Sequence, residues 1–229
     1  MPLRILHTSD LHLASPDDSG CHSLEAVINL AGKTKVGLVI IAGDLFDYFT
    51  VDDSLVSFVV EQLQRLSVYV AILPGNHDCL APDSVFERTS LWQNADNIRV
   101  FRALQGETFT FPELGVSVWG KPLTFNQGFD TRPLDGAPQL KGNSQWHIAV
   151  VHGYYIHPEP SPFMDSIITR EEVVTSGWDY IALGHLVDFH CVCDEPMKAY
   201  YSGSPSQSGT VAIVDFADDT GVQVTPYSL

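Results

Sequence analysis

Three polar residues, Asn76, His77 and Asp78, follow an apolar stretch and could together bind a metal ion or transfer a proton. The stretch at 68–73 is rich in β-branched and aromatic residues, which predicts a buried strand. A proline and a glycine then favour a turn. Asparagine offers an oxygen to a hard cation, histidine a lone pair or a proton, and aspartate a fixed charge. An ordinary polar turn explains these residues equally well, so the rest of the chain decides between the two interpretations.

Four other apolar segments end in residues of the same kind. Asp10 and His12 follow the first of them, and Asp44, His152 and His185 follow one segment each, every one of these three beside a glycine. All the donors are oxygen or imidazole nitrogen and none is sulfur, a combination that suits Mn, Fe or Zn. One polar residue at a strand end is unremarkable, but five such ends predict a metal site.

The elements that position these residues alternate between apolar strands, polar loops and amphipathic helices, which predicts an α/β fold. Helices are expected around 24–31, from a cap at Asp52 or Asp53 to 66, at 83–93, and at 169–177, where a capping box opens the helix. Strands are expected at 3–7, 36–42, 68–73, 98–101, 108–111, 115–119, 146–151, 179–183, 199–202, 210–216 and 222–227. The segment 121–143, rich in Gly and Pro, is expected to be a long loop bordering the site.

Composition narrows the class of protein. The chain has 229 residues, which suits one α/β domain, and carries 12 Lys and Arg against 28 Asp and Glu, a net charge of −16. The basic residues are scattered, which argues against tight binding to long duplex nucleic acid. No apolar run is long enough to span a bilayer, no secretory leader precedes the first strand, and four cysteines are too few for a disulfide framework. We therefore predict a cytoplasmic protein with no membrane partner.

Taken together, the motifs resemble those of one family. Asp10-x-His12, Gly43-Asp44, Gly75-Asn76-His77-Asp78, His152-Gly153 and Gly184-His185 are similar, in kind and order, to the motifs of the calcineurin-like metallophosphoesterases. The segments 7–12, 43–47 and 201–205 look most like the SbcD-type DNA repair exonuclease branch. The resemblance implies a four-layer α/β/β/α sandwich of two mixed sheets flanked by helices. We expect one metallophosphoesterase domain over 1–229, without a separate capping domain.

The resemblance also implies roles for individual residues. It implies two divalent ions, Mn in the first place with Fe or Zn as alternatives. Asp10 and His12 would bind the first ion, Asp44 would bridge both, and Asn76, His152 and His185 would bind the second. A hydroxide between the ions would attack phosphorus, and His77 would protonate the leaving oxygen. Either Asp47 or Asp78 would orient His77, with Asp47 preferred.

The chain departs from the family pattern at one position. The pattern ends Gly-His-x-His, whereas Val187 stands here where the second histidine is expected. The first ion would then lose a protein ligand, leaving that site weak or filled by water. Asp188 or His190 are the candidate substitutes, since three residues can span about 10 Å.

The activity implied is hydrolysis of phosphodiester bonds, of the kind carried out by DNA repair nucleases. The acidity favours short or single-stranded nucleic acid as the substrate, and a partner ATPase is implied by the resemblance alone. A phosphomonoesterase or cyclic-nucleotide phosphodiesterase is one alternative, and a metal-poor scaffold that binds a protein partner is another. Protein phosphatase activity is disfavoured because Tyr48, and not the phosphate-binding arginine of those enzymes, follows Asp47.

Overall fold

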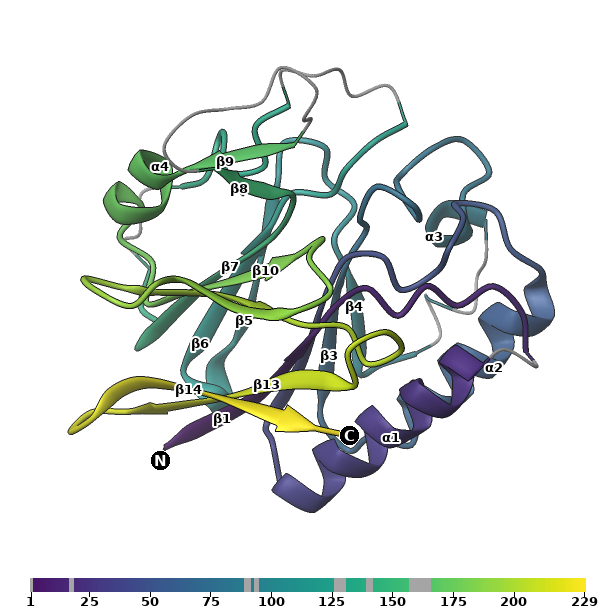
Figure 1. Cartoon of the computed structure of the whole chain (residues 1–229), viewed down its shortest axis with the longest axis horizontal. Helices are drawn as coiled ribbons and strands as arrows, with labels where there is room; N and C mark the ends of the chain where they lie inside the picture. Colours follow the sequence, from purple (N-terminus) through teal and green to yellow (C-terminus); the bar gives the residue numbers. More distant parts are fainter. Residues whose placement is uncertain are drawn as a thin grey trace.

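Two six-stranded sheets lie face to face in the computed structural model of the chain (Figure 1). The structure describes residues 2–16, 19–88, 92, 95–125, 131–138, 142–156 and 166–229. The first sheet has the strand order β14-β13-β1-β2-β3-β4, and the second has the order β11-β12-β10-β7-β6-β5. A third, two-stranded sheet pairs β8 with β9.

Both large sheets are mixed, with parallel strands inside and antiparallel strands at an edge. In the first sheet β1 to β4 are parallel, and β13 and β14 continue it antiparallel. The first sheet contains β1 (Leu3–Thr8), β2 (Leu38–Ala42), β3 (Tyr69–Leu73), β4 (Ile98–Val100), β13 (Thr210–Ala217) and β14 (Gly221–Ser228). The second contains β5 (Glu107–Phe111), β6 (Val116–Gly120), β7 (Trp146–His152), β10 (Tyr180–Gly184), β11 (Phe189–Cys193) and β12 (Lys198–Ser202). A 3-10 turn, η2 (Pro112–Leu114), joins β5 to β6.

Apolar side chains fill the space between the sheets and cover their outer faces. Helices α1 (Ser19–Thr34) and α2 (Asp53–Gln64) bury one apolar stripe each against the outside of the first sheet. The outside of the second sheet packs against α4 (Arg170–Thr175) and the small sheet of β8 (Tyr154–Ile156) and β9 (Ile167–Thr169). The predicted four layers are therefore confirmed, with one outer layer made of a short helix and a small sheet.

Two predicted elements differ from the structure. The helix expected at 83–93 is described only as the single turn α3 (Val85–Arg88), and several of the later residues, Gln93 among them, lie outside the described part. The Trp92 indole donates a hydrogen bond of 3.0 Å to the Val85 carbonyl, the group that a continuing helix would pair with residue 89. The segment after Gly153, expected to be a loop, forms the strand β8 because it pairs in parallel with β9.

The ends of the helices follow the predicted caps in part. Thr169 and Glu172 form the predicted capping box at the start of α4. Asp52 is the residue at the cap of α2, but its side chain accepts no capping hydrogen bond there. None of the helices in the described part of the chain combines the length and the apolar character needed to cross a membrane.

A buried histidine links the two sheets through the apolar core. His7 in β1 is hydrogen-bonded at 2.8 Å, through Nδ1, to the hydroxyl of Tyr180 in β10. Burial lowers the pKa of His7 to about 3 from its ordinary value of 6.5. Between these two values the unfolded chain binds a proton that the folded chain does not, so acid favours unfolding.

We expect the substitution His7→Asn, whose amide can keep the bond to Tyr180, to remove this sensitivity to acid. Between about pH 6 and about pH 4, the free energy of unfolding of the wild type should fall by about 1.4 kcal/mol per pH unit more than that of the variant. Urea denaturation at a series of pH values measures both slopes. Equal slopes would contradict a neutral His7 in the folded protein.

Candidate metal centre

The carboxyl ends of parallel strands from both sheets meet at one place. Strands β1, β2 and β3 are neighbours in the first sheet, and β7 and β10 are neighbours in the second. The end of β2 touches the end of β7, where His152 donates through Nδ1 to the Ala42 carbonyl oxygen at 2.8 Å. The loops that follow all five strands therefore deliver their polar residues to a common point.

Two glycines allow this close approach. A Cβ atom at Gly184 would overlap the carbonyl oxygen of Ala42, and one at Gly43 would overlap the imidazole of His152. Gly43 also has a φ of 93°, which side chains with a Cβ rarely adopt. The glycines of the motifs are thus required for the two sheets to come together at this end.

Four donor atoms converge around His152. Its Nε2 lies 3.2 Å from Asp44 Oδ2, 2.9 Å from Asn76 Oδ1 and 3.1 Å from His185 Nδ1. The last two residues are themselves 3.0 Å apart through the same atoms. Atoms bound about 2.1 Å from one metal ion lie about 3.0–3.4 Å from each other, so the spacing fits a common ion.

The hydrogen bonding of His152 requires positive charge at this point. Because Nδ1–H donates to Ala42, a neutral His152 presents a lone pair at Nε2, and a carboxylate and an amide oxygen face that lone pair. Although burial alone would lower it, the Asp44 carboxylate raises the pKa of His152 to about 9. A proton or a metal ion can supply the charge, and a histidine that donates its other N–H to a backbone carbonyl is the usual arrangement for a metal ligand.

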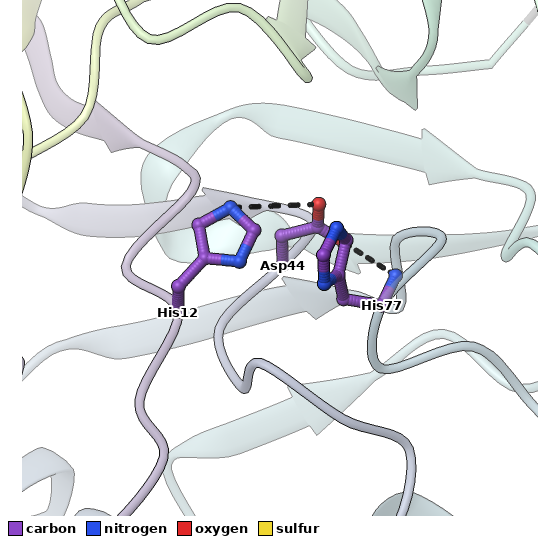
Figure 2. Close-up of side chains that lie close together, drawn as sticks. All are labelled: His12, Asp44 and His77. Carbon is purple, nitrogen blue, oxygen red and sulfur yellow. Dashed lines mark hydrogen bonds and ion pairs between the residues drawn. The ribbon is translucent and has the colours of Figure 1, made fainter.

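A second, looser group shares Asp44. Figure 2 shows His12 and His77 on either side of its carboxylate. His12 Nε2 lies 3.8 Å from an oxygen of Asp44 and 3.8 Å from Asp10 Oδ1. Asp10 in turn accepts a hydrogen bond of 3.0 Å from the backbone N–H of His185. The structure therefore brings together all six residues predicted to be ligands, with Asp44 common to both groups.

Asp47 and Asp78 occupy different environments. Asp47 lies beside His77, whose Nδ1 is 3.0 Å from the Asp47 carbonyl oxygen and 3.4 Å from its Oδ1. The Asp47 carboxylate also lies 3.1 Å from Nδ1 of His12. Asp78 is fully buried and accepts backbone N–H bonds of 2.8 Å from Leu45, 3.1 Å from Phe46 and 2.7 Å from Gly75. Asp47 is thus placed to orient His77, and Asp78 joins the two loops that carry Asp44 and Asn76.

Val187 lies on the side of the centre that holds Asp10. Its carbonyl oxygen accepts 2.8 Å from the N–H of Ser204, whose hydroxyl donates 2.6 Å to the carbonyl oxygen of Asp10. Asp188 and His190, the candidate substitutes, are exposed, and neither joins a ligand group within the residues that the structure describes. No side chain of these three thus completes the first group.

Two contacts of the centre are absent from the predicted set. The ring of Tyr154 meets the ring of His185 edge-on, with centroids 3.9 Å apart. Ser204 holds the backbone of Asp10 through the hydrogen bond described above. The position of Tyr154 directly after His152-Gly153 was a signal that could have indicated its role, whereas the contact of Ser204 joins residues 194 positions apart.

The backbone at the centre adopts unusual conformations. Among the seven described non-glycine residues with positive φ, four are predicted ligands: Asp10 at 55°, His12 at 52°, Asp44 at 53° and His185 at 107°. Such residues store conformational strain that the surrounding structure must hold in place. Hydrogen bonds such as that from the N–H of His77 to Asp44 Oδ1, at 3.0 Å, supply this hold.

We expect Asp78→Asn to destabilise the protein although it preserves the side-chain volume. The amide places an NH₂ group against a backbone N–H donor, and an unpaired buried donor costs about 1–3 kcal/mol beyond the lost charge-assisted bond. The free energy of unfolding should fall by about 2–4 kcal/mol, as measured by guanidinium denaturation. The matched control is Asp219→Asn at an exposed position. Equal stabilities of the two variants would contradict the role assigned to Asp78.

Comparison with known proteins gives relatives that match most of the chain. The chain is 28% identical over 233 residues to uncharacterized metallophosphoesterase YhaO of Bacillus subtilis (strain 168), covering 88% of this chain and 53% of that one. It is 23% identical over 200 residues to DNA double-strand break repair protein Mre11 of Methanopyrus kandleri, covering 80% and 44%. A shorter match, 34% identical over 88 residues, covers 34% of this chain and 22% of one of the subunits of the nuclease SbcCD of Escherichia coli (strain K12). The chain spans about half the length of the first two relatives.

Solved structures share the fold at low sequence identity. TT1561 of Thermus thermophilus has a TM-score of 0.67 at 10% identity and covers 100% of this chain and 99% of its own. A dimetal phosphatase from Danio rerio has a TM-score of 0.64 at 12% identity, covering 99% and 98%. The sequence profile described as calcineurin-like phosphoesterase matches residues 3–189, which is most of the chain. The chain therefore belongs to the calcineurin-like phosphoesterase family.

Proposed function

We propose that the chain is a divalent-metal-dependent phosphodiesterase that acts on short or single-stranded nucleic acid. The observation that carries the proposal is the convergence of Asp44, Asn76, His152 and His185 on one point where positive charge is required. Two relatives are described as a DNA repair protein and a nuclease, which supports a phosphodiester of nucleic acid as the substrate. The net charge of −16 disfavours a long duplex, because a duplex is held mainly through its phosphates.

The donor set suits two cations. Asp44, Asn76, His152 and His185 would hold one of them, and Asp10, His12 and Asp44 the other. We favour Mn²⁺, since imidazole with carboxylate and amide oxygen suits a borderline cation. The chemistry that such ions supply when bound is polarisation of the phosphoryl oxygens and activation of a water nucleophile.

His77 is the side chain that we assign to proton transfer. Its Nδ1 faces Asp47, its backbone N–H is bonded to Asp44, and 42% of its side chain is exposed. With Nδ1–H donated to the Asp47 carbonyl oxygen, Nε2 is the atom left to exchange a proton with the leaving oxygen. Asp47 acts here as a positioning residue that sets the orientation of the ring.

Activity and metal content test the proposal together. Purified protein with added Mn²⁺ should hydrolyse bis(p-nitrophenyl) phosphate, and a chelator should abolish the reaction. We expect His77→Ala to lower kcat by about 10²–10⁴-fold, the usual share of a general acid, while the bound metal stays near the wild-type amount. His22→Ala, at an exposed histidine of α1, is the control. Loss of metal in His77→Ala would show that this residue is a ligand, and a wild type with neither metal nor turnover would favour a protein-binding scaffold.

Val187→His should restore the ligand that the family pattern contains. Since Val187 lies beside the strand end of Asp10, an imidazole there is expected to tighten the weaker of two Mn²⁺ sites by at least about tenfold, or 1.4 kcal/mol. Isothermal titration calorimetry with Mn²⁺ measures the number and affinity of the sites in both proteins. Val187→Ala controls for the change in volume. An unchanged weaker site in Val187→His would refute the link between this position and the first ion.

A further inference from the structure

An open cavity of about 660 Å³ lies next to the loop that carries Asn76 and Asp78. One wall begins at Leu80, two residues beyond Asp78, and another contains Phe125. The two walls are tied together, since the N–H of Phe125 donates to the Leu80 carbonyl oxygen at 3.2 Å. The volume falls within the usual range of about 300–1,000 Å³ for sites of small molecules.

Exposed apolar side chains gather at this cavity. Among the described residues, the large apolar side chains that are exposed are Tyr48, Leu104, Phe125 and Leu229. Phe125 and Leu104 line the cavity with exposed fractions of 62% and 57%. Tyr48 is 62% exposed and directly precedes Phe49, whose ring packs on that of Phe125 at a centroid distance of 5.3 Å. Single exposed apolar residues are common, but several at one cavity indicate a binding surface.

The aromatic surface continues to the proposed proton donor. His77 is held by the carbonyl oxygen of Asp47, and Tyr48 and Phe49 come next in the chain before the contact with Phe125. A phosphodiester whose phosphorus lies at the metal centre therefore has an aromatic surface beside one of its two organic groups. This inference rests on the proposed function.

The charges around the cavity favour a neutral ligand group. Asp83 and Glu87 are balanced by Arg88 and Arg102, although the chain as a whole carries a net charge of −16. Both guanidinium groups already donate to backbone carbonyl oxygens, Arg88 to that of Val51 and Arg102 to that of Phe86. The cavity therefore offers flat apolar contact with little free charge.

We infer that this cavity binds a nucleobase of the substrate, stacked on Phe125. A base is flat and neutral, and stacking on an aromatic side chain is worth about 1–3 kcal/mol per base. The phosphate next to that base would then lie toward the metal centre.

Binding of a nucleoside without phosphate tests the cavity independently of catalysis. Thymidine should bind the intact chain without added metal, as measured by titration of chemical shifts. Phe125→Ala should weaken binding about 5–100-fold, and Phe125→Leu, which keeps apolar contact without a flat ring, should also weaken it. Leu229→Ala, at an exposed apolar residue outside the cavity, should leave it unchanged. Circular dichroism confirms that each variant is folded.

Two diesters with the same reporter group extend the test to catalysis. With Mn²⁺, Phe125→Ala should raise KM about tenfold for p-nitrophenyl thymidine 5′-phosphate and leave KM for p-nitrophenyl methyl phosphate unchanged. Equal effects on the two diesters, or none, together with thymidine binding that does not depend on Phe125, would overturn the inference while the proposed function stands. Thymidine binding that depends on Phe125, without hydrolysis of either diester, would support the base site and refute the proposed function.

Discussion

The buried contact between Asp44 and His152 is the interaction on which the rest of the structure depends. Both side chains are almost entirely buried where the ends of β2 and β7 meet, and their closest atoms are 3.2 Å apart. A buried charge is costly unless it is paired, and this pair brings a carboxylate from one sheet against an imidazole from the other. The sheets must therefore approach closely at this end, which is why glycines flank both residues and why a side chain at Gly184 would collide with the first sheet.

The surrounding loops are shaped to hold that contact and the charge it needs. Four of the predicted ligands lie on backbone with positive φ, and hydrogen bonds from neighbouring loops keep them there. Asp78 contributes from below the centre, since burial raises its pKa to about 7 while three backbone N–H groups face its oxygens. Such an arrangement orders the ligands before any substrate arrives, which is a requirement for electrostatic catalysis.

The acidity of the chain and the cavity beside the centre are compatible features. A protein with a net charge of −16 gains little from long-range attraction to a polyanion, so affinity for a nucleic acid has to come from local contacts. The metal centre offers such contacts to one phosphate, and the aromatic surface around Phe125 offers them to a neighbouring base. A short substrate uses both, whereas a long duplex would keep its bases stacked and expose its phosphates to repulsion.

The sequence by itself determined the fold and the identity of the predicted ligands, because apolar strands that end in Asp, Asn or His bring those residues to one sheet edge whatever the loops do. The tertiary structure decided what depends on distant contacts. It placed Asp47 beside His77 and buried Asp78 under two backbone loops, although both aspartates stand in equivalent positions after their motifs. It also ended α3 early through the Trp92 indole and placed Val187 next to Asp10 through Ser204. Each of these outcomes is set by a side chain reaching across the fold, and local sequence patterns carry no record of such a partner.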